Sequence, residues 1–198
     1  MQNPILKDFP EAFETRRLSI RSPMPGDGEE KHRALSESLD NLRPWIGWAH
    51  HEKTPEDSEA SVRRARAAFV ERTDLQMSLF DKESGALVGG SGLHRMDWEV
   101  PKFEIGYWCR GSFEGGGYIT EAVRGIAGFT FELLGARRLE ICCHHENRRS
   151  AAVAERAGFR LEAELREDQV SPDGRPGNTL IYAMLADDHE RPSDSFSL

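Results

Sequence analysis

Residues 107–122 are the segment whose residue types and spacing most clearly point to chemistry. They read YWCRGSFEGGGYITEA, so that three consecutive glycines, Gly115 to Gly117, separate an apolar run from a helical pattern. Glycines let successive backbone N–H groups turn toward one point, and the start of a helix adds partial positive charge. Such a loop can bind a phosphate or pyrophosphate, although a plain solvent loop has the same composition.

Two familiar nucleotide-binding motifs do not match this loop. A P-loop closes with Gly-Lys-Ser or Gly-Lys-Thr, whereas Tyr118 and Ile119 follow Gly117 here. A dinucleotide-binding fold carries its glycine fingerprint after the first strand of a repeated unit, and several predicted strands precede this loop. Both motifs are therefore excluded.

The histidine and cysteine pairs give weaker evidence for a functional site than the glycine loop does. His50-His51 and His144-His145 are neighbours in sequence, and neighbours on a strand face opposite sides, so neither pair easily chelates one ion. With no Cys or carboxylate at zinc-type spacing, we predict no metal site. Cys109, Cys142 and Cys143 are an odd count, and two of them are adjacent, which argues against a disulfide framework. The adjacent pair fits a buried strand better than a nucleophile.

The hydrophobic pattern on both sides of the loop predicts a mixed α/β sheet. In the middle of the chain a strand, a helix and a strand follow one another, which demands a parallel pair with a right-handed crossover, while the surrounding hairpins are antiparallel. Thr54 and Pro55 followed by acids are typical of a helix start. We expect seven strands, over residues 16–21, 76–81, 87–96, 103–109, 139–143, 159–167 and 179–185, and four main helices, over residues 28–41, 54–73, 118–134 and 150–157.

Length and composition set limits on the function. The chain has 198 residues, enough for one domain with its own core, and 26 Lys and Arg against 34 Asp and Glu give a net charge of −8. That charge has the wrong sign for nucleic-acid binding. No apolar run approaches the roughly 20 residues that cross a bilayer, and residues 1–8 lack the form of a secretory signal. We expect one domain over residues 1–190, a frayed tail over 191–198, and a cytoplasmic location without nucleic-acid or membrane partners.

Six short segments, each weak by itself, occur in an order and spacing that together are specific. They are residues 14–18 (ETRRL), 42–45 (LRPW), 104–108 (EIGYW), 115–122 (GGGYITEA), 146–150 (ENRRS) and 157–159 (AGF). The set resembles the GNAT N-acetyltransferases, in particular the branch typified by RimJ and RimL, the ribosomal-protein N-terminal acetyltransferases. The resemblance covers roughly residues 14–187. It departs from the family at Glu114, where Gln or Arg is usual, and at Ile119, where Gly or Ala is usual.

The resemblance implies the GNAT fold, a mostly antiparallel sheet whose central parallel strands splay apart, and acetyl-CoA as co-substrate. The pantetheine arm would lie between strands 103–109 and 139–143, paired with backbone as an added strand would be. The pyrophosphate would lie on the loop, so Glu114 must point away or CoA binding is weakened. The expected cofactor-binding residues are Ile105, Tyr107, Trp108, Cys109, Arg110, Gly115, Gly116, Gly117, Tyr118, Ile119, Thr120, Asn147 and Ser150, the last near the sulfur.

Acetylation of an amine requires a group that removes a proton. Glu104 is the leading candidate, because it shares a strand face with Gly106 and Trp108 that could direct it to the acetyl group. A solvated strand charge would give the same pattern. Glu121 is a second candidate, although an acid in the first turn of a helix also complements the helix dipole. His94, at the end of a predicted strand, is either a base or an exposed loop histidine.

The leaving thiolate requires a proton donor. Many GNAT enzymes place a tyrosine on the last short helix, and Ala154 stands at that position here. Ser150 is the substitute we expect, unless its hydroxyl only begins the helix. Trp45, Trp48 and Trp98 are expected beside the acceptor cleft, either lining it or packed in the core.

These expectations together describe an N-acetyltransferase that moves acetyl from acetyl-CoA to a primary amine by direct attack in a ternary complex. By resemblance, the best acceptor is the N-terminal α-amine of a protein or peptide. A small-molecule amine acetyltransferase and a non-catalytic acyl-CoA-binding module are the alternatives. A homodimer fits this branch of the family, but the sequence does not show it.

Overall fold

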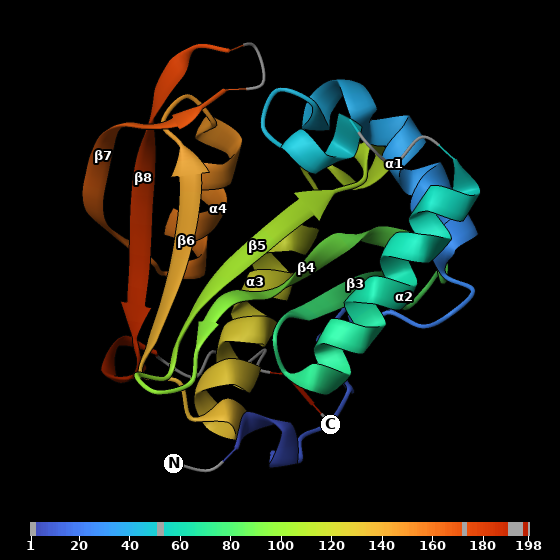
Figure 1. Ribbon diagram of the computed structural model, residues 1–198, viewed down its shortest axis with the longest axis horizontal. Helices are drawn as coiled ribbons and strands as arrows, with labels where there is room; N and C mark the ends of the chain where they lie inside the picture. The colour runs from blue at the N-terminus through green and yellow to red at the C-terminus, as the bar shows by residue number, and fades with distance from the viewer. Residues whose placement is uncertain (1–2, 51–53, 172–173, 190–195, 198) are drawn as a thin grey trace.

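The computed structural model describes residues 3–50, 54–171, 174–189 and 196–197. Within them, eight strands form one open sheet in the order β1-β2-β3-β4-β5-β6-β8-β7 (Figure 1). The strands are β1 (Ala12–Glu14), β2 (Leu18–Arg21), β3 (Leu75–Asp81), β4 (Leu87–Asp97), β5 (Lys102–Cys109), β6 (Arg138–His144), β7 (Arg160–Val170) and β8 (Pro176–Leu185), and the main helices are α1 (Gly28–Leu42), α2 (Pro55–Glu71), α3 (Tyr118–Phe129) and α4 (Arg148–Ala157). The predicted mixed α/β architecture is confirmed.

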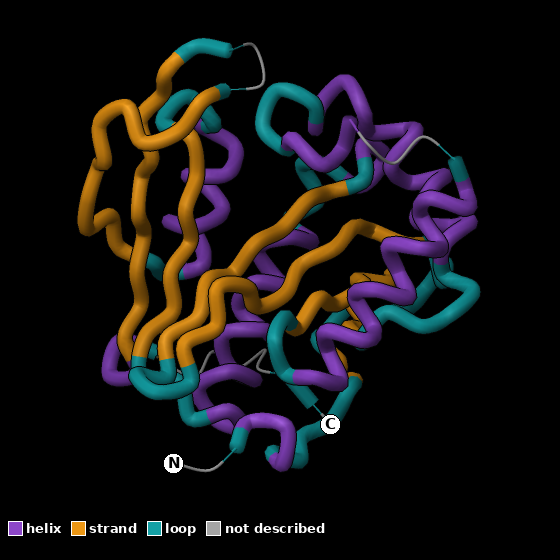
Figure 2. The backbone as a smooth tube through the Cα atoms, in the orientation of Figure 1, coloured by secondary structure: helices purple, strands orange, loops and turns teal. Residues whose placement is uncertain are grey.

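The central feature of the sheet is the parallel pair β5 and β6, connected through α3. Their register covers three positions and ends where Glu104 pairs with Glu140. Beyond that point β5 stays paired with β4 as far as Cys109, and β6 stays paired with β8 as far as His144. Figures 1 and 2 show the two halves of the sheet diverging from there. The splay that the family resemblance implied is therefore present.

The helices cover both faces of the sheet. The helix α1 packs on β4 and α2 packs on β3, whereas α3 and α4 lie on the opposite face of the sheet (Figure 1). Alternate residues of β5 consequently point to different helices, because side chains alternate along a strand. Trp108 packs against Leu35 and Leu42 of α1, and Tyr107 reaches Ser150 of α4. We call these the α1 face and the α4 face of β5.

Local sequence signals explain where the helices begin and end. The Thr54 hydroxyl accepts a hydrogen bond from the Asp57 N–H, and the Asp57 carboxylate accepts one from the Thr54 N–H, a capping box with Pro55 at the first helical position. The start predicted there is confirmed. The helix α3 continues into a π-helical turn over Thr130–Leu134 and ends at Gly135, whose φ is 71°. No helix in the described part of the chain is long and apolar enough to cross a membrane.

One strand is additional to the seven we expected. It is β1, which has three residues and pairs only with β2 in the sheet order, so it offers too short a pattern to recognise. Ser197 forms a bridge with Glu14 of β1, and Phe196 packs 5.5 Å from the Phe13 ring. Two residues of the expected tail thus contact the domain, while residues 191–195 and 198 lie outside the described part.

Candidate active site

The glycine loop lies between the end of β5 and the start of α3. Gly115 and Gly117 have φ of 75° and 77°, in the left-handed region that favours glycine. Gly117 is the N-cap residue of α3, and its helix start receives no side-chain cap. The N–H groups of Tyr118, Ile119 and Thr120 therefore have no partner within the helix. Their partial positive charge makes this end of α3 suited to an anion.

Arg17, in the turn between β1 and β2, holds the glycine loop in place. Its Nη1 donates to the Gly116 carbonyl oxygen over 3.0 Å, and its guanidinium lies 4.0 Å from the centre of the Tyr118 ring. Its Nε and backbone N–H both donate to the Glu121 carboxylate, which also accepts from the Thr15 hydroxyl. Burial alone would raise the pKa of Glu121, but these hydrogen bonds outweigh it and lower the pKa. Glu121 is thus held by β1–β2 contacts, apart from the other predicted catalytic residues.

Glu114 has a cationic partner that we did not expect. Its Oε2 accepts from Arg149 Nη1 of α4 over 2.6 Å, and its Oε1 accepts from Asn41 Nδ2 of α1 over 3.1 Å. These two contacts join the loop to a helix on each face of the sheet. The negative charge that departs from the family pattern is therefore balanced within this chain.

Arg110 joins the loop to α1. Its Nη1 lies 2.9 Å from Glu30 and its Nε lies 2.6 Å from Glu37, and only 14% of its side chain is exposed. The same Glu37 accepts from the Ser112 N–H. The Arg110 backbone N–H donates to the Val88 carbonyl oxygen. Although expected to bind cofactor, Arg110 has its guanidinium and its N–H engaged by the protein.

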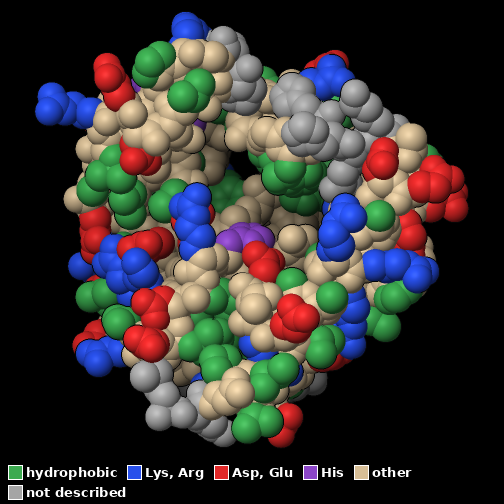
Figure 3. Space-filling model, viewed as in Figure 1, with side chains coloured by type: hydrophobic (Ala, Val, Ile, Leu, Met, Phe, Trp, Pro, Cys, Tyr) green, Lys and Arg blue, Asp and Glu red, His purple; other side chains and the backbone are tan. Residues whose placement is uncertain are grey.

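The gap between β5 and β6 runs beside residues 105–109. These residues pair with β4 on one side, and their other edge faces away from any paired strand because the β6 register has ended. An unpaired strand edge presents alternating N–H and C=O groups, which amides of an extended ligand can bind as an added strand would. Figure 3 shows a deep hollow between the two halves of the molecule, where β5 and β6 diverge in the same view.

On the α4 face of the gap, three side chains meet. The Tyr107 hydroxyl donates to the Ser150 carbonyl oxygen over 2.9 Å and lies 3.0 Å from the Ser150 hydroxyl. Asn147 caps α4 by accepting from the Ser150 N–H. Burial raises the pKa of Tyr107 far above its usual value and also raises the pKa of Cys143, which Ser150 partly offsets. Tyr107 and Ser150 therefore present neutral hydroxyl groups beside the gap.

The α1 face of the gap carries Glu104 and His94, which are register partners on β5 and β4. Glu104 accepts from Arg95 Nη1 over 2.7 Å and is 16% exposed. His94 Nδ1 lies 2.7 Å from an oxygen of Asp74. Burial, followed by the Glu104 carboxylate, raises the pKa of Cys142 to about 12, so this cysteine is a thiol and a poor nucleophile, as its position in a strand predicted.

Aromatic side chains lie across the α1 face of the gap. The Trp48 ring centre is 6.4 Å from that of Trp108 on β5, and the Trp45 ring centre is 5.7 Å from that of His144 on β6. The segment between α1 and α2 therefore contacts both strands that border the gap. Trp98 lies elsewhere: its ring packs on Phe103 against the core, which is the core-packing alternative that the sequence left open for it.

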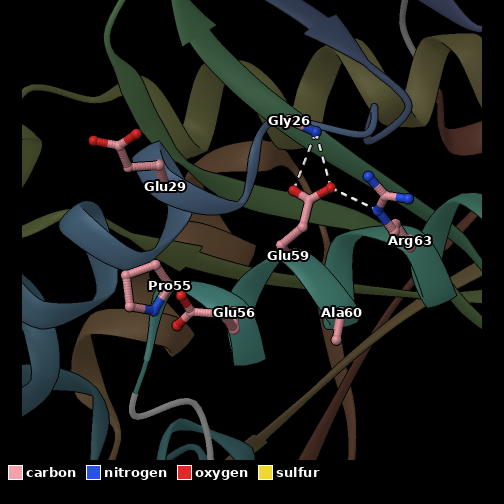
Figure 4. Close-up of a pocket in the computed structure, with 7 residues that line it drawn as sticks. All are labelled: Gly26, Glu29, Pro55, Glu56, Glu59, Ala60 and Arg63. Carbon is pink, nitrogen blue, oxygen red and sulfur yellow. Dashed lines mark hydrogen bonds and ion pairs between the residues drawn. The ribbon is translucent and has the colours of Figure 1, made fainter.

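A shallow hollow of about 470 Å³ lies between α1 and α2, away from the gap (Figure 4). The Glu59 carboxylate in it accepts from the Gly26 N–H and pairs with Arg63 over 2.7 Å. Glu29 and Glu56 also line the hollow. A surface with three carboxylates and one guanidinium repels phosphate groups, so these contacts fasten the start of α1 to α2 and make a poor nucleotide site.

Other candidate groups add no second site. Within the described residues, no three His, Cys, Asp or Glu side chains are grouped to hold a metal ion. Of the histidine pairs considered from sequence, His51 lies outside the described residues.

Asp74 and Arg149 are the site-facing side chains that sequence reasoning missed. Asp74 comes just before β3 and so lies opposite His94 across the β3–β4 register, a signal that strand pairing alone could have supplied.

Comparisons with known proteins agree with this geometry. The family described as "Acetyltransferase (GNAT) domain" matches residues 17–160. The "Putative ribosomal N-acetyltransferase YdaF" of Bacillus subtilis (strain 168) is 30% identical over 169 residues, which are 85% of this chain and 91% of that protein. The ribosomal-protein-serine acetyltransferase of Escherichia coli (strain K12) is 26% identical, over 88% of this chain and 98% of its own length.

Solved structures show the same fold. RimL, a ribosomal alpha-N-protein acetyltransferase in complex with coenzyme A, superimposes with a TM-score of 0.84 at 19% identity, covering 91% of this chain and all of that one. A "Probable acetyltransferase" superimposes with a TM-score of 0.79 at 29% identity, covering 86% of this chain and 93% of that one.

Proposed function

This chain belongs to the GNAT acetyltransferase family, and we propose that it uses acetyl-CoA to acetylate the N-terminal α-amine of a protein or peptide. The observation that carries the proposal is the parallel pair that stops after three positions, with the glycine loop and the uncapped start of α3 beside the gap. An extended amide-containing arm and a diphosphate fit these two features together.

The residues present fit the donor. The edge of β5 from Ile105 to Cys109 would pair with the amides of the pantetheine arm, and the N–H groups from Gly115 to Thr120 would hold the pyrophosphate. Asn147 uses its side-chain oxygen to cap α4, which leaves its NH2 group to donate to the arm. Acetyl-CoA supplies a thioester carbonyl for attack and a sulfur leaving group. No metal is needed for this chemistry.

The acceptor assignment rests on the cost of deprotonation and on relatives whose names include ribosomal proteins. At pH 7, deprotonating an α-amine with a pKa of about 7.7–8.0 costs about 1 kcal/mol, and a lysine amine at about 10.4 costs roughly 4–5 kcal/mol. A modest base therefore suffices for an N-terminus. Such a substrate implies a cytoplasmic location.

The two faces of the gap divide the proton transfers. On the α1 face, Glu104 attracts the cationic amine and His94 lies beside it to accept the proton. On the α4 face, Ser150, with Tyr107 behind it, supplies a proton to the departing sulfur. Glu121 has no part in this proposal, because its carboxylate already accepts from Thr15 and Arg17.

A panel of acceptors tests the proposal. Thiol release from acetyl-CoA would be measured with peptides bearing free α-amines, the same peptides blocked at the N-terminus but containing lysine, and polyamines or amino sugars. We expect turnover with free N-termini and little with blocked peptides. Preference for the small amines would instead support the small-molecule alternative. CoA binding by calorimetry without turnover on any amine would support the non-catalytic module.

A further inference from the structure

Asp74 and His94 form a hydrogen-bonded pair on the α1 face. Asp74 is the residue before β3, and His94 lies within β4. The 2.7 Å contact joins Asp74 Oδ2 to His94 Nδ1, and both side chains are about 30% exposed. The other carboxylate oxygen, Oδ1, is buried with no hydrogen-bond partner among the described residues. A buried polar atom left unpaired costs free energy, so this arrangement is not explained by stability alone.

The backbone directs His94 toward the gap. The β4–β5 register shifts directly after His94, and Arg95 in this bulge has φ of 45°, which is unusual for a residue with a side chain. The His94 ring lies over Gly106. A Cβ at Gly106 would come within 3.0 Å of His94 Nε2 and 2.8 Å of Cδ2. Glycine at this position of β5 therefore leaves the space that the imidazole occupies, close to where the β5–β6 pairing ends at Glu104.

An ionised carboxylate only accepts hydrogen bonds, so Nδ1 of His94 carries the hydrogen and Nε2 is the free acceptor. We propose that Asp74 is a positioning residue that fixes His94 in this tautomer, with Nε2 directed to the amine of the acceptor. The inference rests on the proposed function. The amine first gives one proton to solvent, and as the neutral nitrogen bonds to the acetyl carbon, its second proton passes to Nε2 while the carbon–sulfur bond breaks with its electron pair on sulfur. Sulfur takes a proton from the Ser150 hydroxyl, which takes one from solvent in turn, and His94 returns its proton to solvent.

The groups around His94 fit this division of roles. Glu104 on β5 is paired with Arg95, and Cys142 on β6 is a thiol next to Glu104. Of these groups, Asp74 alone has an oxygen at hydrogen-bonding distance from the imidazole.

Nuclear magnetic resonance of the His94 ring nitrogens, in the protein without substrates, gives a readout independent of activity. We expect the Nδ1–H form in the wild type and a mixture of tautomers in Asp74→Asn. The matched control Asp40→Asn changes the same group on an exposed part of α1 and should leave the signals unchanged. An unaltered tautomer in Asp74→Asn overturns the inference.

Kinetics then test the consequence for turnover. Asp74→Asn should lower kcat at least 10-fold with little change in the KM for acetyl-CoA. Asp74→Glu, which keeps the carboxylate, should retain part of the wild-type kcat. His94→Gln should have a lower kcat than Asp74→Asn. The double variant should be no slower than His94→Gln, because the two residues act as one unit. Full kcat in Asp74→Asn overturns the inference alone. A wild type that binds acetyl-CoA but acetylates no amine overturns the proposed function as well.

Discussion

Arg149 in the first turn of α4 and Glu114 in the loop before α3 are joined by a 2.6 Å contact between Nη1 and Oε2. Arg149 is 78% exposed and Glu114 is 28% exposed. An ion pair this exposed contributes only about 0–1 kcal/mol to stability. Its larger effect is on charge, since Glu114 directly precedes the three glycines proposed to bind pyrophosphate.

Changing either partner should alter CoA affinity in opposite directions. Glu114→Gln removes a negative charge beside the phosphates and should tighten CoA binding about 3- to 10-fold, a factor equivalent to roughly 1 kcal/mol. Arg149→Gln leaves Glu114 without its cationic partner and should weaken binding by a similar factor. Calorimetry at low and high salt measures both, and the differences should shrink as salt screens them.

The control for this charge effect is Glu29→Gln. Glu29 lies on α1 and also pairs with an arginine, Arg33, but it is not part of the loop. The CoA affinity of the Glu29→Gln variant should match that of the wild type. If Glu114→Gln weakened CoA binding, the carboxylate would be a structural support of the loop and the electrostatic explanation would be wrong.

The loop glycines give a second prediction with a closely matched control. Gly115 and Gly135 have φ of 75° and 71°, and a Cβ at either would meet no atom within 4 Å. Alanine at each should therefore cost a similar backbone strain, about 1–2 kcal/mol. Only Gly115→Ala should also lose CoA affinity, at least 10-fold, because only it changes the direction of the loop N–H groups. Thermal unfolding and calorimetry separate the two effects, and equal affinities would contradict the proposed phosphate site.

Much of the fold could be predicted because its signals are local. The capping box at Thr54, the glycine after Leu134 and the alternation along residues 103–109 each depend on neighbours in sequence. The strand β1 was missed because three residues at an edge carry almost no pattern. The separation of β5 from β6 came from the family resemblance, since no local pattern marks the position where a strand loses its partner.

The candidate site was less predictable because its contacts are long-range. From sequence, Glu121 was either a base or an acid that complements the helix dipole, yet Thr15 and Arg17 donate to it from more than 100 positions away. The Arg149–Glu114 pair and the Tyr107–Ser150 contact likewise join elements that only the folded sheet brings together. Sequence alone identified residue types suited to the chemistry, while tertiary structure decided which of them have other partners.

Glu104→Gln should reduce turnover more than it affects the donor. The substitution keeps the shape of a side chain that is 16% exposed but removes the charge that attracts the acceptor amine. We expect kcat/KM for the amine to fall at least 10-fold, with the dissociation constant for acetyl-CoA unchanged. Glu162→Gln on β7 is a control, because Glu162 also pairs with an arginine, Arg138. Equal activity of Glu104→Gln and the wild type would reject the assignment.

Glu121 should contribute to the pH dependence of stability. Its pKa is lowered in the folded protein by Thr15 and Arg17, so the charged form is stabilised relative to the unfolded chain. This contribution is fully present above the unfolded pKa of about 4.3 and is lost as pH falls through the lower folded pKa. Glu121→Gln should therefore be less stable than the wild type at pH 7, with a difference that shrinks toward pH 3. Urea unfolding at both pH values measures it, and a constant difference would mean that the ionised carboxylate is not what the donors stabilise.

Substitutions of Tyr107 and Ser150 should have different effects, the first on stability and the second on turnover. Tyr107→Phe removes a partly buried hydroxyl that donates to the Ser150 carbonyl oxygen, so it should cost about 1 kcal/mol of unfolding free energy. Ser150→Ala leaves that carbonyl in place but removes the hydroxyl beside the gap, so it should lower kcat about 10- to 100-fold. A donor that protonates the sulfur matters most when the leaving thiol is basic. Acetyl esters of more acidic thiols should therefore restore much of the turnover of Ser150→Ala, measured as initial rates under saturating peptide. An equal deficit with acidic and basic thiols would show that Ser150 shapes the end of α4 and does not donate the proton.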